Sequence, residues 1–235
     1  MKQIKFGIVA IAALIGIQSV TAQTVDEVVN KYVDALGGKE KLASLKTVRM
    51  EATMTANGAD IEITITKSQM VGQRMDIAVM GMNGYQIITP TAGWSFMPFA
   101  GQTSPEAMKD EQLKSGLSAL DLQGNLFNYK EKGNQLELLG KEKVGDADCY
   151  KIKATLKSGK IITYFIDSKT NYIVKSVSKQ NINGEEKEVE NGYSNYKATS
   201  NGFIFPYTGT NVQGEMNFTK IEVNVPVDAK IFVAN

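Results

Sequence analysis

The hydrophobic pattern of this chain begins with a helical period. Between residues 25 and 36, apolar side chains recur every three or four residues, which is the spacing of one helical face. Thr24 and Glu27 have the spacing of a capping box, in which each side chain accepts the other residue's backbone N–H. Gly37 and Gly38 favour a helix end, because glycine adopts the left-handed conformation without strain. We therefore predict an N-terminal helix, followed by a short helical turn over residues 40–45.

From Thr47 onward the period changes to two, which indicates strands with one apolar and one polar face. The predicted strands of this first half are 47–55, 60–66, 74–80, 85–89 and 94–99. Asn57–Gly58 and Asn83–Gly84 lie between strands, and such pairs favour tight hairpin turns because both residues tolerate positive φ. Strands joined by so few residues pair antiparallel, so the pattern predicts a five-stranded meander.

Residues 100–132 interrupt the strand pattern. Ser104 is a candidate N-cap with Pro105 at the first helical position, which predicts a helix through Lys114 that Gly116 ends. An insertion of this length within a β meander is more often functional than an idle loop. We expect it to form a lid.

The second half returns to strands. Residues 160–177 form the clearest predicted hairpin, because two runs rich in β-branched and aromatic residues flank the turn-forming Asp167, Ser168 and Asn171. Asn183–Gly184 predicts a further turn. The other predicted strands are 136–140, 150–156, 203–207 and 215–225, with a charged turn at 141–148, a polar segment at 185–196 and Phe232 packing back on the domain.

The first 22 residues have the pattern of a secretory signal peptide. Lys2 and Lys5 precede an apolar run over 6–17, and the small residues of 20–22 form a cleavage site. The run is short for a membrane-spanning helix, although an uncleaved anchor remains the alternative. No cysteine stands near the cleavage point, so the sequence predicts no lipidation. We expect a signal peptide at 1–22 and one domain at 23–235, in an extracytoplasmic compartment.

Composition excludes several classes of function. The chain has 26 basic and 25 acidic residues, so it lacks the excess of positive charge typical of nucleic-acid-binding proteins. It contains no histidine, which excludes Ser-His-Asp and Cys-His catalysis and histidine metal sites. Cys149 is the only cysteine, so no intramolecular disulfide forms, and we interpret it as a buried, unreactive thiol. We predict neither a metal nor another cofactor.

Acidic clusters offer the remaining candidates for catalysis or metal binding. Four glutamates lie within 185–190, where we expect a solvated hairpin tip. Asp146 and Asp148 could contact Ca²⁺, but calcium usually takes six to eight oxygen ligands. We therefore predict no catalytic residue and no enzyme activity, with a carboxylate-based hydrolase as a minor alternative.

Methionine and aromatic residues of the first half are candidates for an apolar ligand site. Thioether side chains are flexible and polarisable, and so suit a surface that accommodates varied apolar shapes. The predicted ligand-binding residues are Met50, Met54, Ile63, Met75, Ile77, Trp94, Phe96, Met97, Phe99, Met108, Leu113 and Leu117. Ordinary core packing is the competing interpretation. Arg49 and Arg74 could hold the lid through its backbone carbonyls, or could form surface ion pairs.

Several segments together resemble the periplasmic lipoprotein-carrier family, also described as outer-membrane lipoprotein-sorting proteins, which has the LolA/LolB-like fold. They are the opening segment 25–54, TAGWSFMPF at 91–99, TYFIDSKTNYIVKSV at 163–177 and VNVPVDAKIF at 223–232. The resemblance implies a mainly β fold with some helix: an incomplete, strongly curved antiparallel β barrel over helices, with a cavity that shields acyl chains. Arg74 is the nearest match to that family's lid-locking arginine, without its usual proline neighbour.

The resemblance implies a soluble, monomeric, non-enzymatic carrier in the periplasm that binds lipid or lipoprotein acyl chains. Because the lipidated N-terminal cysteine of the family's membrane-anchored receptors is missing, a carrier fits better than a receptor. The alternative is an envelope interaction or sensor module of the same fold that binds a partner protein. On the carrier hypothesis, the ligand is expected between the first meander and the lid.

Overall fold

The computed structural model describes residues 23–56, 58–182 and 185–234. The predicted signal peptide at 1–22 lies outside these ranges, as do Asn57 and Asn183–Gly184 of two predicted turns. Within the described ranges, every helix is too short or too polar to cross a lipid bilayer.

The N-terminal helix forms where the sequence predicts it. α1 spans Val25–Ala35 and begins with a complete capping box. Thr24 N donates to Glu27 Oε2 at 3.1 Å, and Glu27 N donates to Thr24 Oγ1 at 3.3 Å. Gly37 follows with φ of 110°, a value that favours glycine, and α2 (Lys39–Ala43) overlaps the predicted second turn.

One antiparallel sheet contains the thirteen strands of the described chain. They are β1 (Thr47–Ala56), β2 (Ala59–Ser68), β3 (Gly72–Val79), β4 (Met82–Ile88), β5 (Gly93–Phe96), β6 (Glu106–Ala107), β7 (Gln135–Val144), β8 (Ala147–Thr155), β9 (Ile161–Asp167), β10 (Ile173–Ile182), β11 (Glu185–Ala198), β12 (Ile204–Asn211) and β13 (Gly214–Val223). β1 to β5 match the predicted five-stranded meander, and β9 and β10 form the predicted hairpin.

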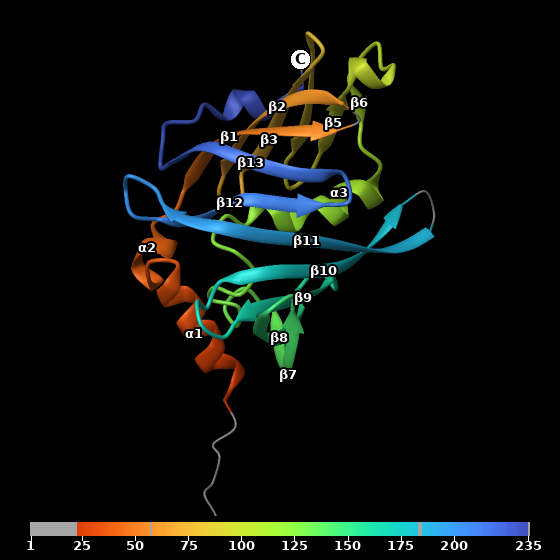
Figure 1. The fold of residues 1–235 in the computed structure, drawn as a ribbon. Helices are drawn as coiled ribbons and strands as arrows, with labels where there is room; N and C mark the ends of the chain where they lie inside the picture. Colours follow the sequence, from red (N-terminus) through yellow and green to blue (C-terminus); the bar gives the residue numbers. More distant parts are fainter. Residues whose placement is uncertain (1–22, 57, 183–184, 235) are drawn as a thin grey trace, which may run out of the picture.

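The last strand joins the two halves of the sheet. The strands follow the order β6-β5-β4-β3-β2-β1-β13-β12-β11-β10-β9-β8-β7, so β13 lies between β1 and β12 (Figure 1). The end strands of the order, β6 and β7, do not pair with each other, and β6 has only two residues. The expected mainly β antiparallel fold with an N-terminal helix and a helical insertion is confirmed, and the sheet is left open, as expected of an incomplete barrel. The expected strong curvature is corrected, because the thirteen strands form an open sheet that is not strongly curled.

The segment between β5 and β7 contains η1 (Pro98–Ala100), β6, α3 (Asp110–Gly116) and η2 (Leu117–Leu120). The predicted helix end at Gly116 is confirmed, but the predicted start at Pro105 is wrong. Glu106 and Ala107 instead pair with Ser95 and Trp94 as a short strand. This pairing outweighs the local N-cap signal, since tertiary context overrides weak helix preferences.

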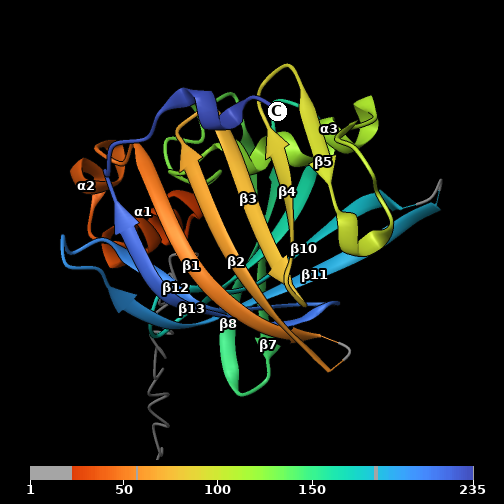
Figure 2. The ribbon, with the colours of Figure 1, turned by 90° about the horizontal axis from the view of Figure 1, so that it is seen from above.

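Helices lie over one face of the sheet, which we call the covered face. On the second half of the sheet, Val28 and Tyr32 of α1 join Ile152 and Ile166 in the largest apolar core. On the first half, Gly116 at the end of α3 approaches Ile88 of β4. Figure 2 shows α1 and α2 on one side of the molecule and α3 beside β5. The segment 110–120 thus covers the first meander, as a lid would.

The C-terminal segment packs on the opposite face of β3. η3 (Ala229–Phe232) places the ring of Phe232, which is 5% exposed, against Gly72. Arg74 Nη1 donates to Ile231 O at 3.2 Å beside it. The prediction that Phe232 packs back on the domain is confirmed.

Candidate ligand-binding site

An apolar pocket of about 230 Å³ lies on the covered face between α1, α2 and strands β9 to β12. Its apolar and aromatic walls are Tyr32, Leu36, Leu42, Leu45, Leu122, Leu126, Tyr164, Ile173, Tyr193, Tyr196, Phe203, Ile204, Phe205 and Pro206. Gln123, Gly124 and Asn125, at the end of the insertion, complete it. No Lys, Arg, Asp or Glu is among its lining residues in the described chain. We call this the first pocket.

Four tyrosine hydroxyls are among the polar groups of the first pocket, beside the side-chain amides of Gln123 and Asn125. Tyr196 Oη donates to Ile173 O at 2.7 Å, and Tyr164 Oη accepts from Asn125 Nδ2 at 2.8 Å. Tyr193 Oη shares a hydrogen bond of 3.1 Å with a serine hydroxyl of β10. These bonds fix the aromatic rings in the wall, since a buried hydroxyl is costly without a partner.

Tyr32 differs from the other three tyrosines. Its hydroxyl has no hydrogen-bond partner among the described residues, although it lines the first pocket. Burial raises the pKa of Tyr32, Tyr164 and Tyr196 well above the ordinary tyrosine value, so these phenols stay neutral. The first pocket therefore offers a neutral hydroxyl within an apolar wall. This combination suits a largely apolar ligand.

A second pocket, of about 250 Å³, shares Tyr193, Phe205 and Pro206 with the first. Its other lining residues are Met50, Ile65, Lys67, Asn191, Gly192, Gly209, Thr210, Asn211, Met216 and Phe218, from β1, β2, β11, β12 and β13. Lys67 is its only charged lining residue in the described chain. The two pockets thus lie side by side on the covered face, at the join between the two halves of the sheet.

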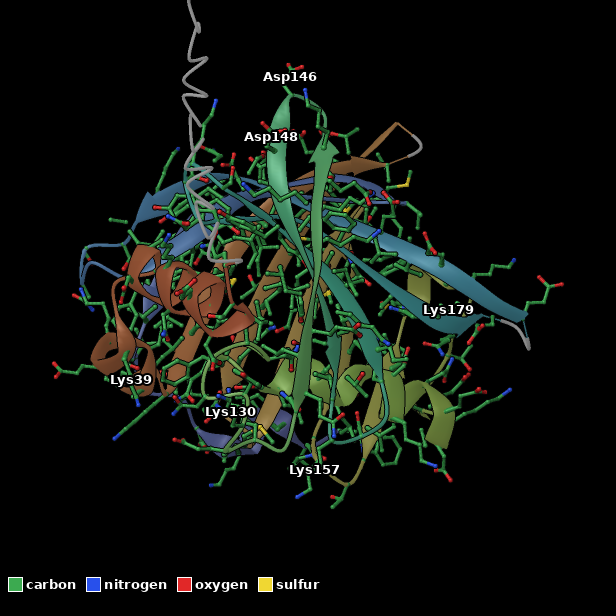
Figure 3. The ribbon with its side chains drawn as sticks, turned by 90° about the horizontal axis from the view of Figure 1, so that it is seen from below. Lys39, Lys130, Asp146, Asp148, Lys157 and Lys179 are labelled. Carbon is green, nitrogen blue, oxygen red and sulfur yellow. The ribbon has the colours of Figure 1, made fainter. Side chains whose placement is uncertain are left out.

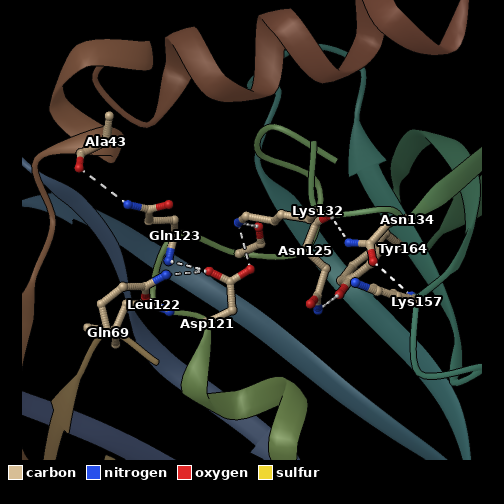
Figure 4. Close-up of polar contacts among 11 residues, drawn as sticks. Ala43, Gln69, Asp121, Leu122, Gln123, Asn125, Lys132, Asn134, Lys157 and Tyr164 are labelled. Atoms are coloured by element: carbon tan, nitrogen blue, oxygen red, sulfur yellow. Dashed lines mark hydrogen bonds and ion pairs between the residues drawn. The ribbon is translucent and has the colours of Figure 1, made fainter. Parts of the chain in front are cut away.

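Asp121 fixes the end of the insertion beside the first pocket. Its Oδ1 accepts from Gln69 Nε2 at 3.0 Å, and its Oδ2 accepts from Lys132 Nζ at 2.6 Å (Figure 4). Gln69 Oε1 also accepts from Leu122 N at 2.6 Å, and Lys132 Nζ donates to Gly124 O at 2.9 Å. The wall segment after η2 is therefore held by charge-assisted bonds on both sides.

A second set of bonds joins the insertion to the later strands. Asn134 Nδ2 donates to Asn125 O at 3.0 Å, while Asn134 Oδ1 accepts from Lys157 N at 3.1 Å (Figure 4). Together with the bond between Asn125 and Tyr164, these contacts attach the first pocket's edge to β8 and β9.

Two lysines reach the lid from the sheet. Lys67 Nζ, on β2, donates to Ala119 O at 3.4 Å. Lys160 Nζ, before β9, donates to Ser115 O at 2.8 Å and to Ser118 Oγ at 3.2 Å. Residues 115–119 are therefore held from both halves of the sheet.

The two arginines lie elsewhere. Arg49 forms an exposed ion pair with Glu51 at 3.5 Å. Arg74 Nε pairs with Asp76 at 2.8 Å, and its guanidinium lies 4.6 Å from the centre of the Tyr85 ring. Their lid-locking role stays a prediction, whereas the lysines already contact the lid.

The strand pairing places five of the twelve predicted ligand-binding residues on one face of the sheet. Cross-strand partners share a face of a sheet. By their pairing, Met50, Met54, Ile63, Met75 and Ile77 all lie on the covered face. Met50 lines the second pocket, and none of the twelve predicted residues lines the first.

The remaining predicted residues divide into two groups. The first group lies on the covered face: Met97 and Phe99 contact Gly84, and Met108 contacts Gly93. Leu113 and Leu117, which belong to the lid, are half-buried. Trp94 and Phe96 instead lie on the opposite face of the sheet. Trp94 pairs with Ile87, and Ile87 pairs with Arg74, whose side chain is on that face. Their role in ligand binding stays a prediction.

The aromatic wall of the first pocket was not found by sequence reasoning. Tyr193 and Tyr196 belong to β11, whose sequence is otherwise mostly polar, and Phe203 and Phe205 alternate around the start of β12. One signal could have indicated this wall: aromatic residues in a polar strand that is followed by a strand with an alternating aromatic pair.

The acidic clusters lie on exposed hairpins. Asp146 and Asp148 project at the tip of the β7–β8 hairpin (Figure 3). Lys179 Nζ pairs with Glu186 across β10 and β11 at 2.7 Å. Cys149 is buried, as predicted, and burial raises the pKa of its thiol. In the described ranges, no group of three or more Cys, Asp and Glu residues could hold a metal ion.

Comparison with solved structures identifies the fold as LolA-like. A LolA superfamily protein from Nitrosomonas europaea has a TM-score of 0.56 and 13% identity, with 90% of this chain and 98% of that chain covered. A DUF1329 family protein from Desulfovibrio piger gives the same TM-score and coverage at 11% identity. No protein-family model and no curated protein matches the sequence. At these identities the likeness is one of fold.

Proposed function

We propose that this LolA-like protein carries lipid or lipoprotein acyl chains through the periplasm without covalent chemistry. The two adjoining pockets on the covered face would hold the chain, and the insertion would close over it. In this proposal residues 1–22 direct export and are removed, and the domain at 23–235 acts as a monomer that is not inserted in a membrane.

The observation that carries this proposal is the uncharged, mostly apolar lining of the first pocket. Burying alkyl groups there contributes roughly 0.8 kcal/mol per CH₂. Each pocket is smaller than the ~300–1,000 Å³ of typical small-molecule sites, but the two share a wall and together reach that range. Their size suits a slender ligand.

Binding of a nonionic alkyl probe tests the proposal. Purified protein is titrated with hexadecanol, which has a long alkyl chain and no charge, and binding is followed by native mass spectrometry. Ile204 lines the first pocket, so Ile204→Trp should fill it and weaken hexadecanol binding at least about tenfold, or ~1.4 kcal/mol.

Ile161→Trp is the matched control, because Ile161 is 49% exposed on β9 and lines neither pocket. It should bind hexadecanol as the wild-type protein does. Absence of binding to wild-type protein, or equal binding by the Ile204→Trp variant, would contradict the proposed pocket.

A second candidate function is an interaction module for an envelope protein. Met80 and Met82, in the β3–β4 hairpin, are 81% and 39% exposed, and Val212 in the β12–β13 turn is 75% exposed. Met54 pairs with both Ile61 and Met216, and Ile61 pairs with Val79 beside Met80, so these turns lie at the same end of the sheet. Exposed apolar groups gathered at one end favour a docking role. Protein purified from the periplasm without any bound lipid would support this candidate over the carrier.

A further inference from the structure

Lys67 is a positive charge without an acidic partner. It lies on the covered face of β2, opposite Val48 of β1 and Gln73 of β3, both of which are buried. In the described chain no carboxylate forms an ion pair with its Nζ, whose only hydrogen bond is the long one to Ala119 O at 3.4 Å. Two of its three N–H donors are therefore available.

The surroundings of Lys67 are costly for a lone charge. Burial lowers the pKa of its ammonium group to about 8, and no nearby charge contributes to that shift. At pH 7 the group is still mainly protonated. The ammonium group of a half-buried lysine is stabilised by an anion that accepts its free donors, because charges in apolar surroundings are normally paired.

The second pocket supplies room for such an anion and for an apolar tail. Lys67 is its only charged lining residue in the described chain, and Met50, Ile65, Phe205, Met216 and Phe218 give it apolar walls. Asn191, Thr210 and Asn211 add uncharged polar groups to the lining. A mostly apolar cavity with one cation in its wall is complementary to an amphiphile with one negative headgroup.

We infer that the second pocket binds a long-chain fatty acid, with the carboxylate on Lys67 and the alkyl tail running toward the first pocket. This inference rests on the proposed function and specifies its ligand. The carboxylate would accept the two free N–H donors of Nζ, and the tail would pass Tyr193, Phe205 and Pro206, which both pockets share.

A carboxylate fits better than a phosphate. Phosphate groups are typically recognised by several donors or by the planar fork of arginine. No arginine lines either pocket in the described chain, and Lys67 provides a single positive charge. The volumes of about 250 and 230 Å³ also favour one alkyl chain over a multi-chain lipid.

The test compares three probes with the same alkyl chain: hexadecanoate, hexadecanol and hexadecyl phosphate. Their affinities for the folded protein are measured at pH 7 by isothermal titration calorimetry. We expect the wild-type protein to bind hexadecanoate at least about tenfold more tightly than hexadecanol, equivalent to ~1.4 kcal/mol, and no less tightly than hexadecyl phosphate. Lys67→Met should abolish the preference and keep the affinity for hexadecanol.

Lys160→Met is the matched control, because Lys160 also contacts the lid but lines neither pocket. It should keep the preference for hexadecanoate. Lys67→Arg retains the positive charge and should also keep the preference for hexadecanoate. This variant still tests the inference if Lys67→Met fails to fold.

The outcomes separate this inference from the proposed function. Equal binding of hexadecanoate and hexadecanol by wild-type protein, or an unchanged preference in the Lys67→Met variant, overturns the inference and leaves the carrier proposal standing. A tenfold preference for hexadecyl phosphate that depends on Lys67 overturns the carboxylate assignment. If no alkyl probe binds, the carrier proposal itself fails.

Discussion

At the scale of single residues, buried polar groups determine what the covered face can bind. Tyr32, Tyr164 and Tyr196 keep their phenols neutral, whereas Lys67 places a cation in an otherwise uncharged wall. Holding a charge in such surroundings lowers the stability of the fold unless a partner compensates. A site that binds ligand transiently tolerates this cost, because the ligand supplies the missing interaction.

Replacement of Lys67 by methionine should change the pH dependence of stability. Its pKa is about 8 in the folded protein, below its ordinary value of 10.5, so between these two values the unfolded chain binds more protons. Wild-type stability then rises with pH across this window relative to the Lys67→Met variant, by at most about 3 kcal/mol. Urea unfolding of both proteins at pH 7 and pH 10.5 measures the change.

Well below pH 8 the Lys67 ammonium is protonated in both the folded and the unfolded state, so the stability difference between wild-type and variant proteins should be constant there. Lys153→Met, on the exposed side of β8, serves as the control and should show no comparable change. If the stability difference between wild-type protein and the Lys67→Met variant stayed constant from pH 7 to 10.5, the pKa of Lys67 would not be lowered by burial.

At the scale of elements, contacts between distant segments decide where several elements begin and end. α3 starts at Asp110 because Glu106 and Ala107 pair with β5. β7 continues to Val144, through the first half of the predicted charged turn at 141–148, because it pairs with β8 along its length. The C-terminal η3 likewise depends on the space that Gly72 leaves for Phe232.

Gly72→Ala should loosen this C-terminal contact. A Cβ at residue 72 would lie 2.6 Å from Cγ of Phe232, so the ring must shift, at a cost of about 1–3 kcal/mol. Phe232→Ala alone should cost about 3–5 kcal/mol through the lost burial. The double variant should lose less than the sum, because removal of the Phe232 ring leaves room for the new methyl group.

Chemical unfolding of the four proteins in this cycle gives the coupling between the two positions. Gly209→Ala is the matched control in β12, where a Cβ meets nothing closer than 3.9 Å. It should change stability by less than about 1 kcal/mol. Strict additivity of Gly72→Ala and Phe232→Ala would show that the ring does not pack on Gly72.

At the scale of the whole molecule, pairing of the first and last strands makes one sheet from two meanders. Val48 lies opposite Val223 and Met50 opposite Ile221, and these residues share an apolar cluster with Leu45 and Phe203. The pockets lie beside this join, so the site depends on both halves being assembled. A ligand bound there would stabilise the entire fold.

Both halves of the sheet should therefore unfold together. Trp94 in β5 and Cys149 in β8 are the only tryptophan and cysteine, and they lie in opposite halves. In a urea titration, the emission of Trp94 and the reactivity of the Cys149 thiol should change at the same midpoint. Two separate midpoints would mean that the meanders fold as independent units.

The sequence by itself determined the local elements, because their signals lie within a few residues. The capping box of α1, the alternation of β1 to β5 and the β9–β10 hairpin with its turn at Asp167 all formed as predicted. Hairpin pairing is local, so its register follows from turn residues and alternation. The LolA-like likeness was also apparent from the order of these elements, and the solved structures support it.

Only the tertiary structure decided the position of β13 between β1 and β12, the open edges of the sheet and the location of the pockets. Each depends on side chains that are far apart in sequence, such as Tyr32 and Tyr193, or Lys67 and Phe218. Alternation shows that a residue faces the covered side, but not which distant residue it meets there. The pockets therefore formed where two separately predictable meanders join, a place that local pattern does not specify.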